Sequence, residues 1–367
     1  MSSTNLIRAV VDAEALRHNL RQVRKVAPDS RIMAVIKANA YGHGLVPTAK
    51  ALAESDGFAV ARLDEGLALR AAGLTNRILL LEGIVTHEQL QIAAHERFEL
   101  MVHSFEQLLL LEALDASGPT LPIWLKVDSG MNRLGFRLDE FPAAYSRLRG
   151  NPRVQPAPTL VTHLASADER EDPATMRQLD AFTQATAGLP GARSIANSAG
   201  VLAWPASRAD WVRPGLMLYG VSPFEQGTGA ELGLKPAMTL CTEVIAVKPV
   251  RAGEGVGYGG TWKAARDTRM AVIAAGYGDG YPRSMASGAP VVVNGRRAGL
   301  IGRVSMDMVT VDVTDLPPVS VGDPVVLWGS DVPVEELAVH AGTIAWDLLC
   351  GVSQRVELEW KCLVASE

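Results

Sequence analysis

A chain of 367 residues that is 48% hydrophobic can bury a large core, and this length predicts two domains, or one barrel with an addition. The formal net charge is only −5 and no basic block is present, which argues against nucleic acid or an anionic membrane and leaves a small molecule as the expected partner. The amino terminus has charges at Arg8, Asp12 and Glu14, so we expect no signal peptide, and no uncharged apolar segment is long enough to span a bilayer. The three cysteines lack the spacing of a zinc site, so we expect no metal and a reduced, cytoplasmic setting.

Strand-like and helix-like patterns alternate before residue 221. After a short apolar start at residues 6–11, residues 12–26 carry leucines and valines at helical spacing, with Asp12 as the expected cap. Eight strand-like runs follow, at residues 32–37, 57–62, 77–82, 98–103, 122–128, 159–164, 192–197 and 211–219. Helix-like stretches lie between them, among them residues 64–72, 86–94, 104–116 and 172–187. Eight alternations predict an α/β fold with a (β/α)8 TIM-type barrel, and a doubly wound parallel sheet is the alternative.

The pattern changes after the barrel. Residues 222–236 are rich in Gly and Pro and predict a linker. The remaining residues show strands without long helices between them, apart from a helix-forming piece at 334–341, which predicts a mostly antiparallel β domain. We therefore expect a cofactor-binding barrel domain over residues 1–228 and a C-terminal β domain over residues 229–367.

The first candidate for chemistry is Lys37, which ends an unbroken apolar run at residues 32–36. Such a run predicts a parallel strand buried on both faces, and ligands bind at the carboxyl ends of the strands in α/β barrels. An apolar floor beneath the lysine favours a nucleophilic amine. The alternative is a strand-end lysine that extends its ammonium group to solvent.

Other polar residues end the other strands, so a barrel would gather them around Lys37. They are Tyr41, Lys126, Asp128, Arg133, His163, Asn197, Ser198, Arg213, Gly215 and Tyr219. Ser198, Gly215 and Tyr41 suit the phosphate site that such barrels place after the last two strands. A phosphate site beside Lys37 suggests pyridoxal 5'-phosphate held by a Schiff base, although aldolases that act on sugar phosphates share these parts.

Several of these residues also have purely structural interpretations. His163 could be a core histidine, Lys126 and Asp128 could form only an ion pair, and Arg133 could be a solvated turn residue. The motif GVGYGG at residues 255–260 matches GxGxxG, but a strand-like run follows it instead of a helix, so we interpret it as a tight turn.

That turn would present Tyr258. Ser305, Met306 and Asp307, further along the second domain, first suggest a polar interruption between strands.

Eight motifs occur in one order: AVIKANAYGHG, KVDSGMNRLGF, THLASADE, ANSAG, VRPGLMLYG, GYGGTW, GYGDGYPR and GRVSMDM. Together they resemble bacterial alanine racemase over nearly the whole chain. The resemblance implies a barrel and a β domain, dependence on pyridoxal phosphate, and a head-to-tail homodimer. It also implies interconversion of L-alanine and D-alanine through an external aldimine, which supplies D-alanine for peptidoglycan.

The resemblance assigns two opposed bases. Lys37 resembles the lysine that forms the Schiff base and acts on the D-enantiomer, and Tyr258 resembles the base for the L-enantiomer, supplied by the partner chain. Racemisation requires a proton to leave one face of the α-carbon and another to arrive on the opposite face. Arg213 is similar to an arginine that faces the pyridine nitrogen, where a permanent cation weakens the electron sink and suppresses side reactions.

The remaining assignments concern binding. Tyr41, Ser198 and Gly215 resemble phosphate contacts, with Asn197 beside them and His163 near the cofactor ring. Arg133 resembles a residue at the cofactor's phenolic oxygen and the substrate carboxylate, and Lys126 one that is often carbamylated and then orients Arg133. Met306 and Asp307 resemble substrate-proximal residues of the second subunit.

One position departs from the family pattern, because Gln354 stands where many relatives have a tyrosine that contacts the phosphate. An amide can still donate a hydrogen bond, so we expect weaker or rearranged phosphate binding. Two rival functions share the cofactor: a decarboxylase of basic amino acids, which Arg213 argues against, and a non-catalytic barrel, which would lack the second domain. Serine or another small amino acid is a further possible substrate.

Overall fold

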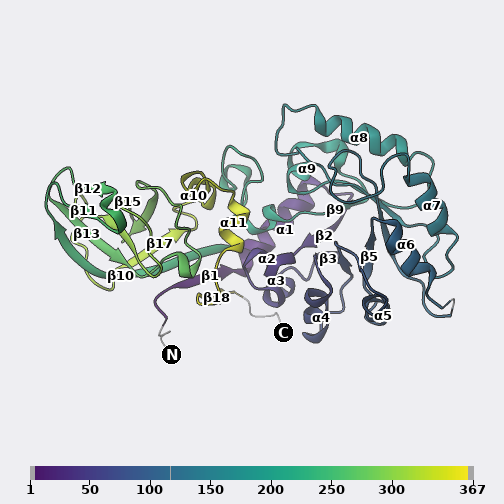
Figure 1. Cartoon of the computed structure of the whole chain (residues 1–367), viewed down its shortest axis with the longest axis horizontal. Coiled ribbons are helices and arrows are strands. Elements are labelled where there is room, and N and C mark those ends of the chain that lie inside the picture. The colour runs from purple at the N-terminus through teal and green to yellow at the C-terminus, as the bar shows by residue number, and fades with distance from the viewer. Residues whose placement is uncertain (1–4, 116, 363–367) are drawn as a thin grey trace.

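The computed structural model describes residues 5–115 and 117–362 and shows an elongated molecule with a barrel at one end and a β domain at the other (Figure 1). Eight parallel strands form the closed barrel: β2 (Arg31–Val35), β3 (Gly57–Val60), β4 (Ile78–Leu80), β5 (Glu99–Val102), β6 (Ile123–Lys126), β7 (Thr159–Val161), β8 (Arg193–Ser194) and β9 (Trp211–Val212). Because β2 pairs with both β3 and β9, the barrel is confirmed and the doubly wound sheet is excluded.

Helices surround this barrel. They are α1 (Ala13–Val26), α2 (Lys37–Tyr41), α3 (Leu45–Ala51), α4 (Leu63–Ala71), α5 (His87–His95), α6 (Phe105–Glu112), α7 (Phe141–Arg149), α8 (Ala174–Ala185) and α9 (Ser198–Ala203), with short 3-10 turns η1 (Pro205–Ser207) and η2 (Leu216–Tyr219). Thr86 and Ser104, the first residues of the expected helical stretches, cap α5 and α6, because each hydroxyl accepts a hydrogen bond from a backbone N–H of the first turn. Helix α6 ends at Glu112, before the expected end at Ala116, which lies outside the described residues.

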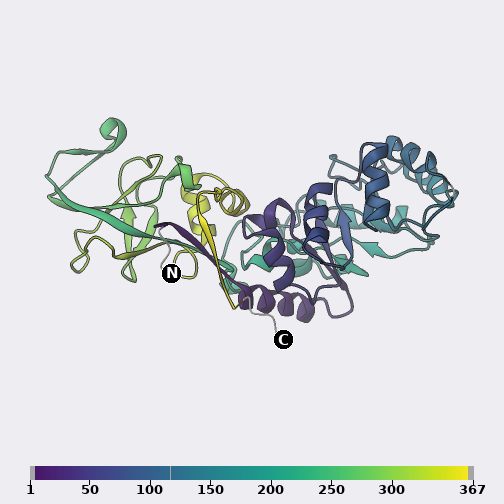
Figure 2. The ribbon, with the colours of Figure 1, turned by 90° about the horizontal axis from the view of Figure 1, so that it is seen from below.

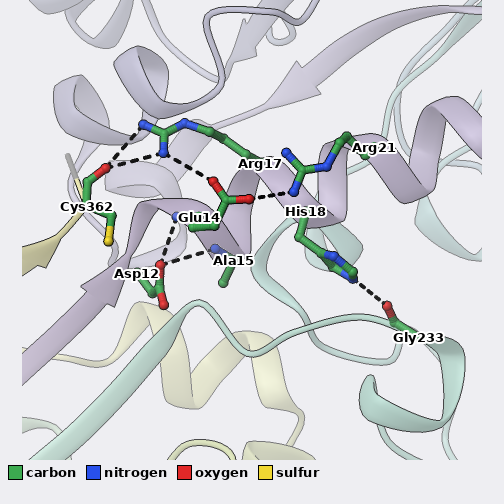
Figure 3. Close-up of polar contacts among 8 residues, drawn as sticks. All are labelled: Asp12, Glu14, Ala15, Arg17, His18, Arg21, Gly233 and Cys362. Atoms are coloured by element: carbon green, nitrogen blue, oxygen red, sulfur yellow. Dashed lines mark hydrogen bonds and ion pairs between the residues drawn. The ribbon is translucent and has the colours of Figure 1, made fainter. Parts of the chain in front are cut away.

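Helix α1 connects the barrel to the rest of the chain. Asp12 caps it, as expected, by accepting hydrogen bonds from two backbone N–H groups of the first turn. Further along the helix, Arg17 donates to the carbonyl of Cys362, and the ring of His18 donates to the carbonyl of Gly233, 2.9 Å away (Figure 3). These contacts fix both the segment between the domains and the last strand against the barrel.

The second domain is built on one eight-stranded sheet, in the order β13-β16-β15-β14-β17-β10-β1-β18, with a further pairing of β13 and β10. Its strands are β1 (Arg8–Asp12), β10 (Met238–Val250), β13 (Thr268–Ile273), β14 (Pro290–Val293), β15 (Arg296–Leu300), β16 (Val309–Asp312), β17 (Pro324–Trp328) and β18 (Glu357–Lys361). The other elements after the barrel are β11 (Gly255–Val256), β12 (Trp262–Lys263), α10 (Val334–Ala341), α11 (Ala345–Cys350), η3 (Ala230–Leu232), η4 (Tyr258–Gly260) and η5 (Tyr277–Asp279).

Strand β1 comes from the start of the chain but belongs to this second sheet. It pairs antiparallel with β10 and parallel with β18, and the views from two sides place β1 and β18 together beside α1 (Figures 1 and 2). All other pairings in this sheet are antiparallel among the described residues, so the expected mostly β domain is confirmed. The expected domain boundary between residues 228 and 229 stays a prediction. No helix in the described part of the chain is long and apolar enough to cross a membrane.

Candidate functional site

Lys37 lies at the carboxyl end of β2 and is followed by an unusual backbone turn. Ala38, Asn39, Ala40 and Tyr41 have φ angles of 54°, 52°, 54° and 52°, which place four successive residues with side chains in the left-handed region. Each such residue costs about 1–2 kcal/mol relative to right-handed backbone. The surrounding structure must therefore hold this segment, which we call the left-handed turn (residues 38–41), in place.

A carboxylate from the first turn of α4 holds the first peptide of the left-handed turn. The Glu65 Oε1 atom accepts a hydrogen bond of 2.6 Å from the backbone N–H of Ala38. The other oxygen, Oε2, accepts from the backbone N–H groups of Ala61, at 2.8 Å, and Arg62, at 3.2 Å. Glu65 therefore connects the start of α4 to the residue that follows Lys37.

A buried histidine holds the other end of the left-handed turn. His43 Nδ1 lies 3.1 Å from the carbonyl oxygen of Ala40 and 2.9 Å from that of Tyr41, so this nitrogen carries the proton and donates. Burial lowers the pKa of His43 to about 4, and hydrogen bonds to the two carbonyls oppose this shift. The imidazole is therefore neutral at physiological pH.

The side chain of Tyr41 packs into an aromatic group. Its ring centroid lies 4.8 Å from that of Tyr219, which in turn lies 4.6 Å from the centroid of His43. The Tyr219 hydroxyl donates to the carbonyl of Val35 at 3.1 Å. Burial raises the pKa of Tyr41, so its hydroxyl keeps its proton, and no described residue forms a hydrogen bond with that hydroxyl.

The structure brings Tyr41, Ser198 and Gly215 together. The Ser198 Oγ atom accepts hydrogen bonds from the backbone N–H groups of Gly215, at 2.9 Å, and Met217, at 3.3 Å, which leaves its own proton available to donate. Next to it, Asn197 caps α9 by accepting from the backbone N–H of Gly200 at 2.9 Å. The hydroxyls of Tyr41 and Ser198, both able to donate a hydrogen bond, therefore lie beside Gly215, which has no side chain.

Arg213 is a buried cation held by neutral groups. Its guanidinium donates to the Ser194 hydroxyl at 2.5 Å, to the carbonyls of Thr162 at 2.7 Å and Ile195 at 3.3 Å, and to His163 Nδ1 at 3.4 Å. Burial lowers the pKa of Arg213 to about 10, so the group remains charged at neutral pH. No carboxylate among the described residues pairs with it.

His163 lies beside this cation. Burial, and then the charge of Arg213, lower the pKa of His163 well below its usual value, so the ring is neutral. His163 therefore lies with the other strand-end residues, 3.4 Å from the guanidinium of Arg213.

Lys126 ends β6 and is only 8% exposed. Burial, and then the charges of Arg213, Arg133 and Lys37, lower its pKa to about 8, while Asp128 opposes this shift. About a tenth of this amine is therefore neutral at pH 7.

Asp128 does not form the ion pair with Lys126 that the sequence allowed. Its Oδ1 atom instead accepts hydrogen bonds from the backbone N–H groups of Gly130, Met131 and Asn132, at 3.0, 2.9 and 3.1 Å. These bonds shape the loop that presents Arg133. The guanidinium of Arg133 is exposed and makes no hydrogen bond to any described residue, so it is available to an anionic ligand.

The second group of predicted site residues lies in the β domain, away from Lys37. Tyr258 is 65% exposed in η4, between β11 and β12, at the end of the molecule farthest from the barrel (Figure 1). Its flanking residues Gly257 and Gly259 have φ angles of 70° and 74°, which explains the glycine-rich motif as a turn. One chain alone therefore does not bring Tyr258 to Lys37.

Met306 and Asp307 lie before β16. Met306 is 52% exposed, and Asp307 Oδ1 accepts a hydrogen bond of 2.8 Å from Arg355. The neighbouring Gln354 is exposed, and no hydrogen bond joins it to the described residues. Its expected effect on phosphate binding stays a prediction.

Comparison with known proteins adds a family relationship to this geometry. The family model for the N-terminal domain of alanine racemase matches residues 11–223, and the model for the C-terminal domain matches residues 237–360. An alanine racemase from Nitrosococcus oceani is 54% identical over 353 residues, which cover 96% of this chain and 98% of that protein. One from Yersinia pestis is 50% identical over 352 residues, with coverage of 96% and 98%.

Solved structures of similar proteins indicate the same family. The biosynthetic alanine racemase from Pseudomonas aeruginosa has a TM-score of 0.94 and 45% identity, and the match covers 98% of this chain and 100% of that one. The alanine racemase from Bartonella henselae, described with covalently bound pyridoxal phosphate, has a TM-score of 0.89 and 29% identity over 97% of this chain and 99% of that one.

Proposed function

The chain belongs to the alanine racemase family, and from this premise we propose that it interconverts L-alanine and D-alanine with pyridoxal 5'-phosphate, in a homodimer that shares its active sites. The observation that carries the proposal is the group of strand-end residues around Lys37. Tyr41, Ser198 and Arg213 lie at the same end of the barrel and offer donors of the kind that an anionic, phosphorylated ring requires.

The donors fit the cofactor. The hydroxyls of Tyr41 and Ser198 keep protons that no described residue accepts, and the absence of a side chain on Gly215 leaves room for the Tyr41 hydroxyl. Both hydroxyls would donate to a phosphate bound beside them. Asn197 holds Ser198 at the start of α9. When bound covalently at Lys37, pyridoxal phosphate supplies an electron sink for the charge that forms when the α-proton of alanine leaves.

Arg213 favours racemisation over other reactions of the same cofactor. Its buried charge, which no carboxylate among the described residues pairs with, would face the ring nitrogen and disfavour protonation there, with neutral His163 near the ring. A weaker electron sink limits decarboxylation and transamination. This cation therefore supports the racemase over the decarboxylase of basic amino acids.

Two opposed bases would move the proton. Lys37 would take the α-proton of D-alanine, and Tyr258 of the partner subunit would take that of L-alanine from the opposite face. Tyr258 is exposed and lies in η4, between β11 and β12, at the end of the molecule opposite the barrel, which supports a head-to-tail dimer in which each site uses both chains. Met306 and Asp307 would reach the substrate from the same second chain.

Arg133 would bind the substrate carboxylate and the phenolic oxygen of the cofactor. Carbon dioxide reacts with neutral amines, so the lowered pKa of Lys126 favours its carbamylation. The product is an anion, which would attract and orient the guanidinium of Arg133. This converts a repulsion between two cations into an ion pair.

The proposed role is supply of D-alanine for peptidoglycan in the cytoplasm. The test is incubation of the purified protein and cofactor with L-alanine, followed by chiral chromatography of the products, with Lys37→Ala as the control. We expect D-alanine from the wild-type protein only. Carbon dioxide released from lysine, ornithine or diaminopimelate, without any D-alanine, would favour the decarboxylase, and parallel reactions with L-serine would define substrate breadth.

A further inference from the structure

The left-handed turn after Lys37 depends on a side chain that is distant in sequence. Ala38 and Ala40 have no side-chain group that could stabilise positive φ angles, so the turn must be held by its surroundings. Glu65 contacts the first peptide of the turn, and this peptide is covalently attached to Lys37. The position of that peptide therefore influences the direction in which Lys37 leaves the end of β2.

The Glu65 carboxylate uses both of its oxygens. One accepts from Ala38, and the other accepts from Ala61 and Arg62 at the start of α4, which is part of the barrel wall. All three partners are N–H donors, so an acceptor-only group of this length fits the position. A glutamine at this position would direct its NH2 group either towards the N–H of Ala38 or towards those of Ala61 and Arg62, so that a donor would face a donor. An aspartate side chain is shorter by about 1.5 Å and could not reach both Ala38 and the start of α4.

We propose that Glu65 is a positioning residue that anchors the Lys37–Ala38 peptide to the barrel wall and thereby holds Lys37 and Tyr41 in place for the cofactor. Its role rests on the proposed function, because the group that it serves is the covalently bound pyridoxal phosphate. Glu65 itself touches neither substrate nor cofactor in this assignment. Its effect passes through the left-handed turn, which directly follows the covalent anchor Lys37 and ends at the proposed phosphate donor Tyr41.

The test compares Glu65→Gln and Glu65→Asp with a matched control, Glu140→Gln. Glu140 also accepts from a backbone N–H at the start of a barrel helix, that of Arg137 at 3.1 Å, but lies outside the site. The apoproteins are titrated with pyridoxal phosphate, and reduction with borohydride followed by mass spectrometry measures the fraction attached to Lys37. Hydrogen exchange of a peptide covering residues 36–45 reports the left-handed turn independently of activity.

We expect both Glu65 variants to bind pyridoxal phosphate about tenfold more weakly, with faster exchange in residues 36–45, while Glu140→Gln matches the wild type. Glu65→Asp keeps the negative charge and a cap for α4, so it remains informative if Glu65→Gln folds poorly. Wild-type affinity and exchange in the aspartate variant would overturn this inference alone. A wild-type protein that does not bind pyridoxal phosphate would overturn the proposed function and this inference together.

Discussion

The hydroxyl oxygen of Tyr41 lies 2.5 Å from the position that a Cβ atom on Gly215 would occupy. This distance is too short for any side chain, and Tyr41 cannot move freely because its ring packs on Tyr219. Gly215→Ala should therefore displace the Tyr41 hydroxyl and weaken the binding of pyridoxal phosphate by about tenfold or more. Titration of the apoprotein measures this affinity.

Gly299→Ala is the matched control for that substitution, because its added Cβ would meet its nearest neighbour at 3.7 Å, an ordinary contact. Equal cofactor affinity in the two alanine variants would contradict the placement of the phosphate beside Tyr41.

His43 should make stability depend on pH. The pKa of this residue is about 4 in the folded protein and about 6.5 in an unfolded chain, so the unfolded state binds more protons between these values. Stability should therefore fall as the pH is lowered through this window, and His43 alone should account for about 2 kcal/mol of loss between pH 7 and pH 5. Urea unfolding at a series of pH values measures the effect.

The variant His43→Gln should be less stable at pH 7 but should lose less stability on acidification. The part of the pH dependence that remains would come from other groups with shifted pKa values, such as the half-buried His163. An unchanged pH slope in this variant would contradict the assignment.

Lys126 should form a carbamate. Since its pKa is about 8, about a tenth of the amine is neutral at pH 7, and this fraction rises with pH. Carbon-13 NMR in labelled bicarbonate should show a carbamate signal that Lys126→Met lacks. The same variant should bind alanine more weakly, because Arg133 loses its anionic partner. A signal of equal intensity in Lys126→Met would assign the carbamate to another group.

The shared active site predicts complementation between two inactive variants. In a mixture of Lys37→Ala and Tyr258→Phe chains, a mixed dimer contains one site with both bases intact. Random exchange of subunits should restore about a quarter of the wild-type racemase activity. Separate preparations mixed under conditions that prevent subunit exchange serve as the control. No recovery after verified exchange would contradict a site built from both chains.

The barrel could be predicted from the sequence because its strands are buried on both faces and therefore appear as continuous apolar runs. The helix starts at Asp12 and Thr86 were predictable for a local reason, since each cap bonds to backbone only two or three residues away. Strand β1 was not assigned to the second sheet, because its partners β10 and β18 lie at the other end of the chain and no local pattern identifies them.

The candidate site was predictable to the extent that strand ends must gather in a barrel. The left-handed turn was not, because alanine and tyrosine have no intrinsic preference for positive φ angles and tertiary contacts impose this backbone. Glu65 and His43, which make those contacts, were therefore missed. Position alone also left the role of Asp128 open, and its three backbone hydrogen bonds show that it shapes the loop of Arg133.

The most direct test of the two-base account is α-deuterium incorporation in D2O, started separately from L-alanine and from D-alanine. The wild-type protein should exchange the α-proton of both enantiomers, and Tyr258→Phe should lose exchange mainly from L-alanine while keeping the visible absorption of the bound cofactor. Absence of exchange in the wild type, or equal loss from both enantiomers in Tyr258→Phe, would contradict the assignment of Lys37 and Tyr258 as opposed bases.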